Sequence, residues 1–90
     1  MDKKEAITIL EEHLVRFSRR DYRELAVLVE EKHIDTFEAL GNSGTRYQVE
    51  IQFLWDDQSG GLIKIFGSVD NGGIRSYFPL SRSELISRPT

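Results

Sequence analysis

The chain has 90 residues, of which 39% are hydrophobic and 30% are charged, and its formal net charge is -3. This length and balance fit one folded domain over residues 1–90 and exclude a disordered chain. The acidic net charge disfavours nucleic acids and anionic membranes as partners, and the lack of cysteine excludes disulfides, a thiol nucleophile and a thiolate metal site.

The first 31 residues predict two helices. Asp21 followed by Glu24 matches a capping box, so a short second helix is expected over about 21–31. Its apolar run 25–29 also fits a buried strand, because short apolar runs do not separate the two, but the cap favours a helix. The first helix, over 2–18, is predicted from apolar residues at helical spacing: Ala6, Ile7, Leu10, Leu14 and Phe17.

From Ile34 to Leu80 the hydrophobic period changes to two, which predicts strands. The clearest alternation runs from Tyr47 to Trp55, where every second residue is aromatic or aliphatic. Glycines at 44 and 60 favour short hairpin loops on either side of this strand. Four strands are expected, over about 34–40, 45–56, 62–70 and 73–80.

The segment 70–73, Asp-Asn-Gly-Gly, is interpreted as the turn that fixes the sheet register. A two-residue type I′ turn at Asn71-Gly72 pairs Val69 with Ile74, Gly67 with Ser76, Ile65 with Phe78 and Ile63 with Leu80. The other loops pair Trp55 with Ile63, Phe53 with Ile65, Tyr47 with Ala39 and Val49 with Phe37. All these residues then share one apolar face.

The sequence therefore predicts an α+β fold. Two N-terminal helices pack on one face of a four-stranded antiparallel β-meander in the order 1-2-3-4. Trp55 is expected in the core against the first helix. A short turn capped by Ser81 and Glu84 is expected after the last strand.

Two stretches, "DTFEALGNSGTRYQVEIQFLWDD" and "GSVDNGGIRSYFPL", resemble a group of small uncharacterised bacterial α+β proteins. The resemblance covers about Tyr22 to Leu80, and in that group short helices precede a four-stranded meander. It implies this fold and no known activity. The matching positions include Gly44, Tyr47, Glu50, Trp55, Asp56, Gly72, Gly73 and Pro79.

The sheet face away from the helices carries the strongest functional signal. Phe66 and Tyr77 are predicted to oppose each other there, next to Leu54 and rimmed by Lys64 and Arg75. An apolar centre with a charged border is typical of a protein contact. We therefore expect a non-enzymatic interaction module that binds an unidentified protein, or weakly a second copy of itself, through this face.

Two alternatives remain open from the residues. The first is a small-anion site at the sheet end where the 42–44 and 70–73 loops are expected to meet, formed by Asn42, Ser43, Arg46, Asp70, Asn71 and Arg75. The second is weak nucleic-acid binding through the Arg16–Arg23 segment, which Asp21 and Glu24 disfavour because they dilute its positive charge.

No pattern of catalytic or metal-ligating residues is present. His13 and His33 lack a nucleophile to serve, and Asp56 and Asp57 point to opposite faces of a strand. We expect no enzyme activity, no cofactor and no metal. The N-terminus runs into the first helix without an apolar leader, which favours a soluble cytoplasmic protein.

Overall fold

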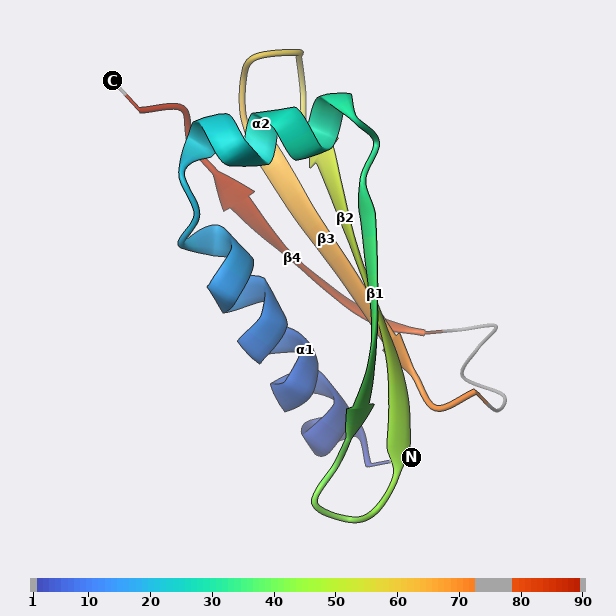
Figure 1. Ribbon diagram of the computed structural model, residues 1–90. Helices are drawn as coiled ribbons and strands as arrows, with labels where there is room; N and C mark the ends of the chain where they lie inside the picture. The colour runs from blue at the N-terminus through green and yellow to red at the C-terminus, as the bar shows by residue number, and fades with distance from the viewer. Residues whose placement is uncertain (1, 73–78, 90) are drawn as a thin grey trace.

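The computed structural model describes residues 2–72 and 79–89. Its elements are α1 Lys3–Ser18, α2 Tyr22–Glu30, β1 Ile34–Leu40, β2 Arg46–Trp55, β3 Ile63–Asp70 and β4 Leu80–Ile86. The strands form one antiparallel sheet in the order β1-β2-β3-β4. Both helices pack on one face of it, called the helix face, and neither described helix covers the other, called the open face (Figure 1). The predicted α+β architecture is confirmed.

Both helices begin at a capping aspartate. The Asp2 carboxylate accepts the backbone N–H of Glu5 at 3.1 Å, and Asp21 accepts that of Arg23 at 3.1 Å. Such caps satisfy amides that lack an intrahelical partner. Residues 25–29, which fit helix or strand, are helical. The helices bury Ala6, Leu10, Leu14, Phe17, Leu25 and Val29. Ile7, also predicted for the apolar face of the first helix, is only partly buried.

The first three strands have the predicted register. Phe53 pairs with Ile65 and Trp55 with Ile63 across β2 and β3. Phe37 pairs with Val49 and Ala39 with Tyr47 across β1 and β2. The loops between them use Gly44 (φ 88°) and Gly60 (φ 84°) in the left-handed conformation, which costs glycine little.

The predicted fourth strand and its register are wrong. β4 begins at Leu80 instead of ending there, so Val69 pairs with Leu80, and Ile63 pairs with Ile86. The residues expected to pair with β3, namely Ile74, Ser76 and Phe78, lie outside the described residues, as does Gly73. Residues 81 to 84, expected to cap a terminal turn, belong to β4.

Two physical features explain this difference. Asp70 accepts the backbone N–H of Gly72 at 2.8 Å, a local turn that does not require β3 and β4 to meet at residue 71. Pro79 cannot donate a ladder hydrogen bond, and it lies just before β4 instead of inside a strand. β4 itself lacks a clear alternation, because the exposed Arg82 and Glu84 occupy its helix-face positions.

The core lies between α1 and the helix face. Gly67 of β3 permits close approach there, since a Cβ atom on it would lie 2.6 Å from Leu10 Cδ1. Trp55, predicted in the core against the first helix, is half-buried at the side of the core, where it contacts α2. Its indole N–H donates to Glu30 at 3.2 Å, and its ring lies 6.5 Å from that of Tyr22. Neither described helix is long and apolar enough to cross a bilayer.

Candidate functional site

The open face divides into an apolar end and a polar end. The apolar end, beside α2, consists of Ile34, Leu54, Phe66 and Leu85, one residue from each strand. Gln52 pairs with both Ile34 and Phe66, and Lys64 of the next row pairs with both Leu54 and Leu85. The sheet register thus holds four apolar side chains in two adjacent rows.

These side chains are exposed to different extents. Ile34 is 52% exposed, Leu54 44% and Leu85 52%, while Phe66 is half-buried. The Lys64 ammonium lies 5.8 Å from the centre of the Phe66 ring, within the range of a cation–π contact. The apolar end is therefore an exposed surface on which four apolar side chains are diagonal neighbours around Gln52 and Lys64, with the Lys64 cation beside the aromatic ring.

A hollow of about 430 Å³ adjoins the apolar end, and its walls include Val29, Ile34, Leu54 and Trp55. It lies where β2 extends beyond β1, because β1 pairs with β2 only as far as Gln52. The last residues of β2 have β3 as their only strand neighbour there. The hollow thus extends the apolar surface from Ile34 and Leu54 on the open face to Val29 of α2.

The structure brings together three of the five residues predicted for a protein contact: Leu54, Lys64 and Phe66. Arg75 and Tyr77 lie outside the described residues. Phe66 is opposite Ser83 and not opposite Tyr77, because β4 starts later than predicted.

Sequence reasoning missed Ile34 and Leu85 as members of the apolar end. Ile34 could have been found, since the predicted pairing of Phe37 with Val49 already places Ile34 opposite Gln52 on the open face. Leu85 could not, because its position depends on the misassigned fourth strand.

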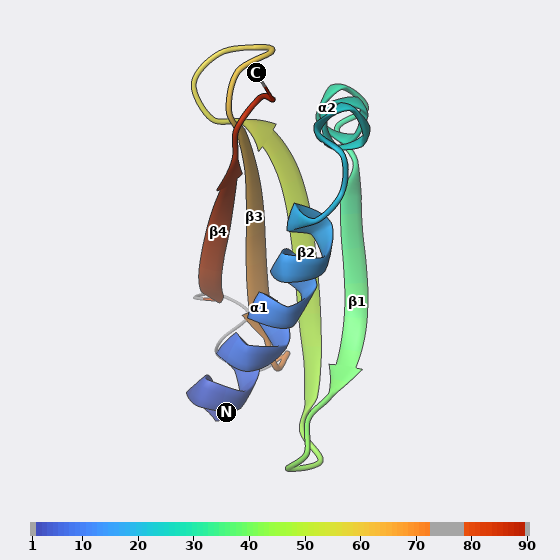
Figure 2. The same cartoon turned by 90° about the vertical axis from the view of Figure 1, so that its left-hand side faces the viewer.

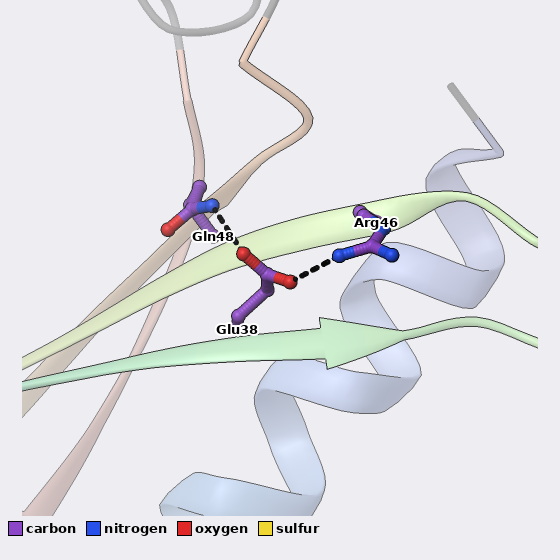
Figure 3. A network of polar contacts seen from close by, with 3 residues as sticks. All are labelled: Glu38, Arg46 and Gln48. Atoms are coloured by element: carbon purple, nitrogen blue, oxygen red, sulfur yellow. Dashed lines mark hydrogen bonds and ion pairs between the residues drawn. The ribbon is translucent and has the colours of Figure 1, made fainter.

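The polar end of the open face is organised around Glu38. Its carboxylate accepts from Arg46 Nη1 at 2.9 Å and from Gln48 Nε2 at 3.4 Å (Figure 3). Nearer the middle of the face, Gln52 donates to Glu50 at 2.8 Å. Because these polar side chains already hydrogen-bond to one another, they do not require a binding partner.

The 42–44 loop does bind a carboxylate, but one from the same chain. The Ser43 hydroxyl donates to Glu5 Oε1 at 2.6 Å, and the Ser43 amide donates to Glu5 Oε2 at 3.1 Å. Tyr47 adds a third donor at 2.8 Å. These hydrogen bonds, from the Ser43 hydroxyl first and Tyr47 second, lower the pKa of Glu5; burial and the bond to Glu5 raise that of Tyr47. Glu5 thereby ties α1 to the β1–β2 loop.

Of the other residues predicted for an anion site, Asn42 directly precedes Ser43 and lines a hollow with Glu5, but the rest are not gathered around Ser43. Arg46 pairs with Glu38 on the open face, whereas Ser43 reaches α1 on the helix face. Asp70 is level with Gln48, roughly 13 Å along β2 from residue 44. Asn42 and Asn71 are exposed, and Arg75 lies outside the described residues. The charged residues that line this hollow are Asp2, Glu5, Glu12 and Lys4, so acidic groups outnumber basic ones there.

The arginines between the helices point to no common ligand. Arg16, Arg19, Arg20 and Arg23 are exposed, and the Arg20 guanidinium lies 4.8 Å from the centre of the Phe17 ring.

The two histidines have different partners and are separate from one another. His33 bonds Asp35 at 2.7 Å, and His13 stacks on Phe37 at 4.7 Å, with its pKa lowered by burial and then by Arg16.

Within residues 2–72 and 79–89, no group of three potential metal ligands comes together. No family model, curated protein or solved structure matches the chain. The resemblance to small bacterial α+β proteins therefore stays a prediction. The apolar end of the open face is the feature of the described residues that most resembles a binding site.

Proposed function

We propose that this protein is a non-enzymatic interaction module that binds a partner protein through the apolar end of its open face. The observation that carries the proposal is the gathering of four apolar side chains, one from each strand, on a surface that neither described helix covers. Exposed apolar side chains are common singly on soluble proteins, whereas contiguous ones mark contact sites.

The surroundings of the apolar end also fit a protein contact. Lys64 and Gln52 lie between the apolar side chains, and Glu50, Ser68 and Ser81 form the next row toward the polar end. Protein contacts commonly combine apolar side chains with polar groups and a polar border in this way. Binding is favoured over catalysis because the groups gathered here are apolar and include no nucleophile with an adjacent base.

The size of the surface sets the expected strength of binding. The whole open face, with four strands of about seven residues, measures roughly 23 by 19 Å. Even a flat partner that covers all of it buries only about 400 Å² on each side. Stable interfaces generally bury more than about 1,000 Å² in total. A tight partner must therefore extend beyond the sheet, for instance into the hollow beside Trp55.

The alternatives have weaker support. A small anion at Ser43 has to displace Glu5, which already holds three donors, and the adjoining hollow is mainly acidic. Nucleic-acid binding through Arg16–Arg23 has to overcome the net charge of -3 and the acids beside the arginines.

The proposal is tested by affinity capture of partners from the native cell with Leu54→Ser/Phe66→Ser as the bait. A matched control, Val15→Ser/Val27→Ser, removes two apolar side chains that are 39% and 53% exposed on the helices. The open-face variant is expected to lose a specific partner by at least about tenfold in affinity, with unchanged circular dichroism. Retention of the same partner by both variants contradicts the proposal.

A further inference from the structure

β1 is an edge strand with an unprotected outer side. Among the described residues it pairs with β2 alone, and no described helix or strand runs along its outer edge in Figure 2. Natural edge strands are usually blocked by charged side chains, above all lysine, by proline, by a bulge or by a covering element, since their free amides and carbonyls attract other strands. The sequence of β1, IDTFEAL, carries charges at Asp35 and Glu38 but contains no lysine and no proline, and its pairing with β2 is continuous over seven residues.

Alternate residues of β1 direct their backbone groups outward. Just beyond the strand, the Gly41 N–H donates to the Thr45 carbonyl at 2.8 Å, so Gly41 and Thr45 form a hydrogen-bonded pair. Because such pairs recur at every second residue of an antiparallel ladder, the odd-numbered residues of β1 are the ones that hydrogen-bond to β2. The N–H and C=O groups of the even-numbered residues, Ile34, Thr36, Glu38 and Leu40, therefore point away from the sheet. Ile34 and Leu40 also have exposed side chains, 52% and 71% respectively.

Neither helix runs along this edge. α1 has most of its contacts with β3 and β4, and α2 has most of its contacts with β2. In Figure 2, α2 is seen end-on at the upper end of β1. The helix-face side chains of β1 consequently stay half-exposed, and Phe37 reaches α1 through the rings of His13 and Phe17. The main contacts of both helices are therefore with strands other than β1.

The sequence of β1 is complementary to itself in one antiparallel register. With a two-fold axis at Phe37, Ile34 faces Leu40, Asp35 faces Ala39 and Thr36 faces Glu38. All seven residues of β1 then pair, its two most exposed apolar side chains, Ile34 and Leu40, face each other, and no like charges are directly opposite one another. Phe37 falls at a non-hydrogen-bonded pair, as the outward direction of the even-numbered residues requires.

Neighbouring registers are poorer. An axis at Glu38 places the two copies of that carboxylate directly opposite each other, and like charges there are destabilising. An axis at Asp35 does the same with the aspartates. An axis at Thr36 leaves Leu40 unpaired and sets Ile34 against Glu38.

We propose that β1 pairs with β1 of a second copy of this chain, antiparallel and with the two-fold axis at Phe37, to form a continuous eight-stranded sheet. This goes beyond binding at the open face, because it uses a different surface. The pair buries a small area, so the dimer is weak and forms at high protein concentration. Both open faces lie on the same side of the joined sheet, which doubles the surface offered to a partner.

Charge variants at Thr36 test the register. Thr36→Glu sets a carboxylate against Glu38 of the second copy, and Thr36→Lys sets an ammonium there. Sedimentation is expected to show dimerisation weakened by the first and strengthened by the second, each roughly 3- to 30-fold, because the dimer contains the contact twice.

Ser68→Glu and Ser68→Lys are the matched controls. Ser68 and Thr36 both pair with Glu50 on the open face, but Ser68 is in the middle of the sheet. Unchanged dimerisation of the Ser68 variants supports the edge contact. A wild-type chain that is monomeric at every concentration overturns it, and so do equal effects at Thr36 and Ser68, which assign self-association to the open face.

Single cysteines give an independent test, because the chain has none of its own. Phe37→Cys places two thiols across the axis with Cα atoms about 4.5 Å apart, close enough for a disulfide. Ala39→Cys places them about 13 Å apart, which is too far. Selective oxidation of the Phe37 variant to a dimer supports the register, and equal oxidation of both variants overturns it.

Discussion

Leu10 of α1 and Leu54 of β2 are the same residue type on opposite sides of the sheet. Leu10 has no exposed surface and packs over Gly67 on the helix face, whereas Leu54 is 44% exposed at the apolar end of the open face. The helices fill one side of the sheet and leave the other uncovered. Apolar residues on the helix face thus stabilise the fold, and those on the open face are available for binding.

The sharpest contrast is expected between Leu10→Ala and Leu54→Ala. Leu10→Ala opens a cavity in a fully buried site and is expected to lower the free energy of unfolding by about 2–5 kcal/mol. Leu54→Ala removes a half-exposed side chain and is expected to cost less than about 1 kcal/mol. Urea denaturation of both variants measures the difference. Equal losses would show that the two faces are packed alike.

Adding a side chain tests the same contrast from the other direction. Gly67→Val forces a branched side chain against Leu10 and Ile51, so unfolding is expected to become easier by about 1–3 kcal/mol. Ser68→Val, one residue later on the open face, is expected to change stability by less than about 0.5 kcal/mol. Thermal unfolding of the pair compares them, and a destabilised Ser68 variant contradicts the uncovered open face.

Acid is expected to weaken the tie between α1 and the 42–44 loop. Because the pKa of Glu5 in the folded state lies below its ordinary value of 4.5, ionised Glu5 stabilises the fold above that pH, and this stabilisation is lost as the pH falls through the folded-state pKa. Glu5→Gln should therefore lower the urea midpoint at pH 7 and flatten its fall in acid. Glu12→Gln, on the same helix, should keep the wild-type profile; identical profiles for the two variants would refute the role of Glu5.

The smallest effect is expected at the polar end of the open face. Glu38 and Arg46 form an ion pair with 53% and 76% of their side chains exposed. Exposed pairs contribute little, so Glu38→Gln should change the free energy of unfolding by at most about 0.5 kcal/mol, and less in high salt. A larger loss in urea denaturation would mean that this end is not a solvated surface.

Local signals predicted most of the fold. Helical spacing and the cap at Asp21 are short-range features, and alternation with glycine loops aligned β1, β2 and β3. β4 escaped prediction because an edge strand with Arg82 and Glu84 at its helix-face positions has no apolar period to detect. Pro79 was the available warning, since proline fits poorly inside a strand.

The candidate site could likewise be predicted only in part from the sequence. Leu54, Lys64 and Phe66 followed from the pairing of Trp55 with Ile63, which fixes the open-face positions of β2 and β3. Leu85 required the true position of β4. The hydrogen bond from Ser43 to Glu5 joins residues 38 positions apart, and no sequence pattern indicates such a contact.

Site-specific photo-crosslinking tests the binding role of the open face most directly. A photoreactive amino acid replaces Ser83, which pairs with Phe66 on the open face, or Glu12, which is exposed on α1. Irradiation in the native cell is expected to yield a defined protein adduct from position 83 and none from position 12, and Leu54→Ser should abolish that adduct. The same adduct from both positions, or from position 12 alone, would contradict binding through the open face.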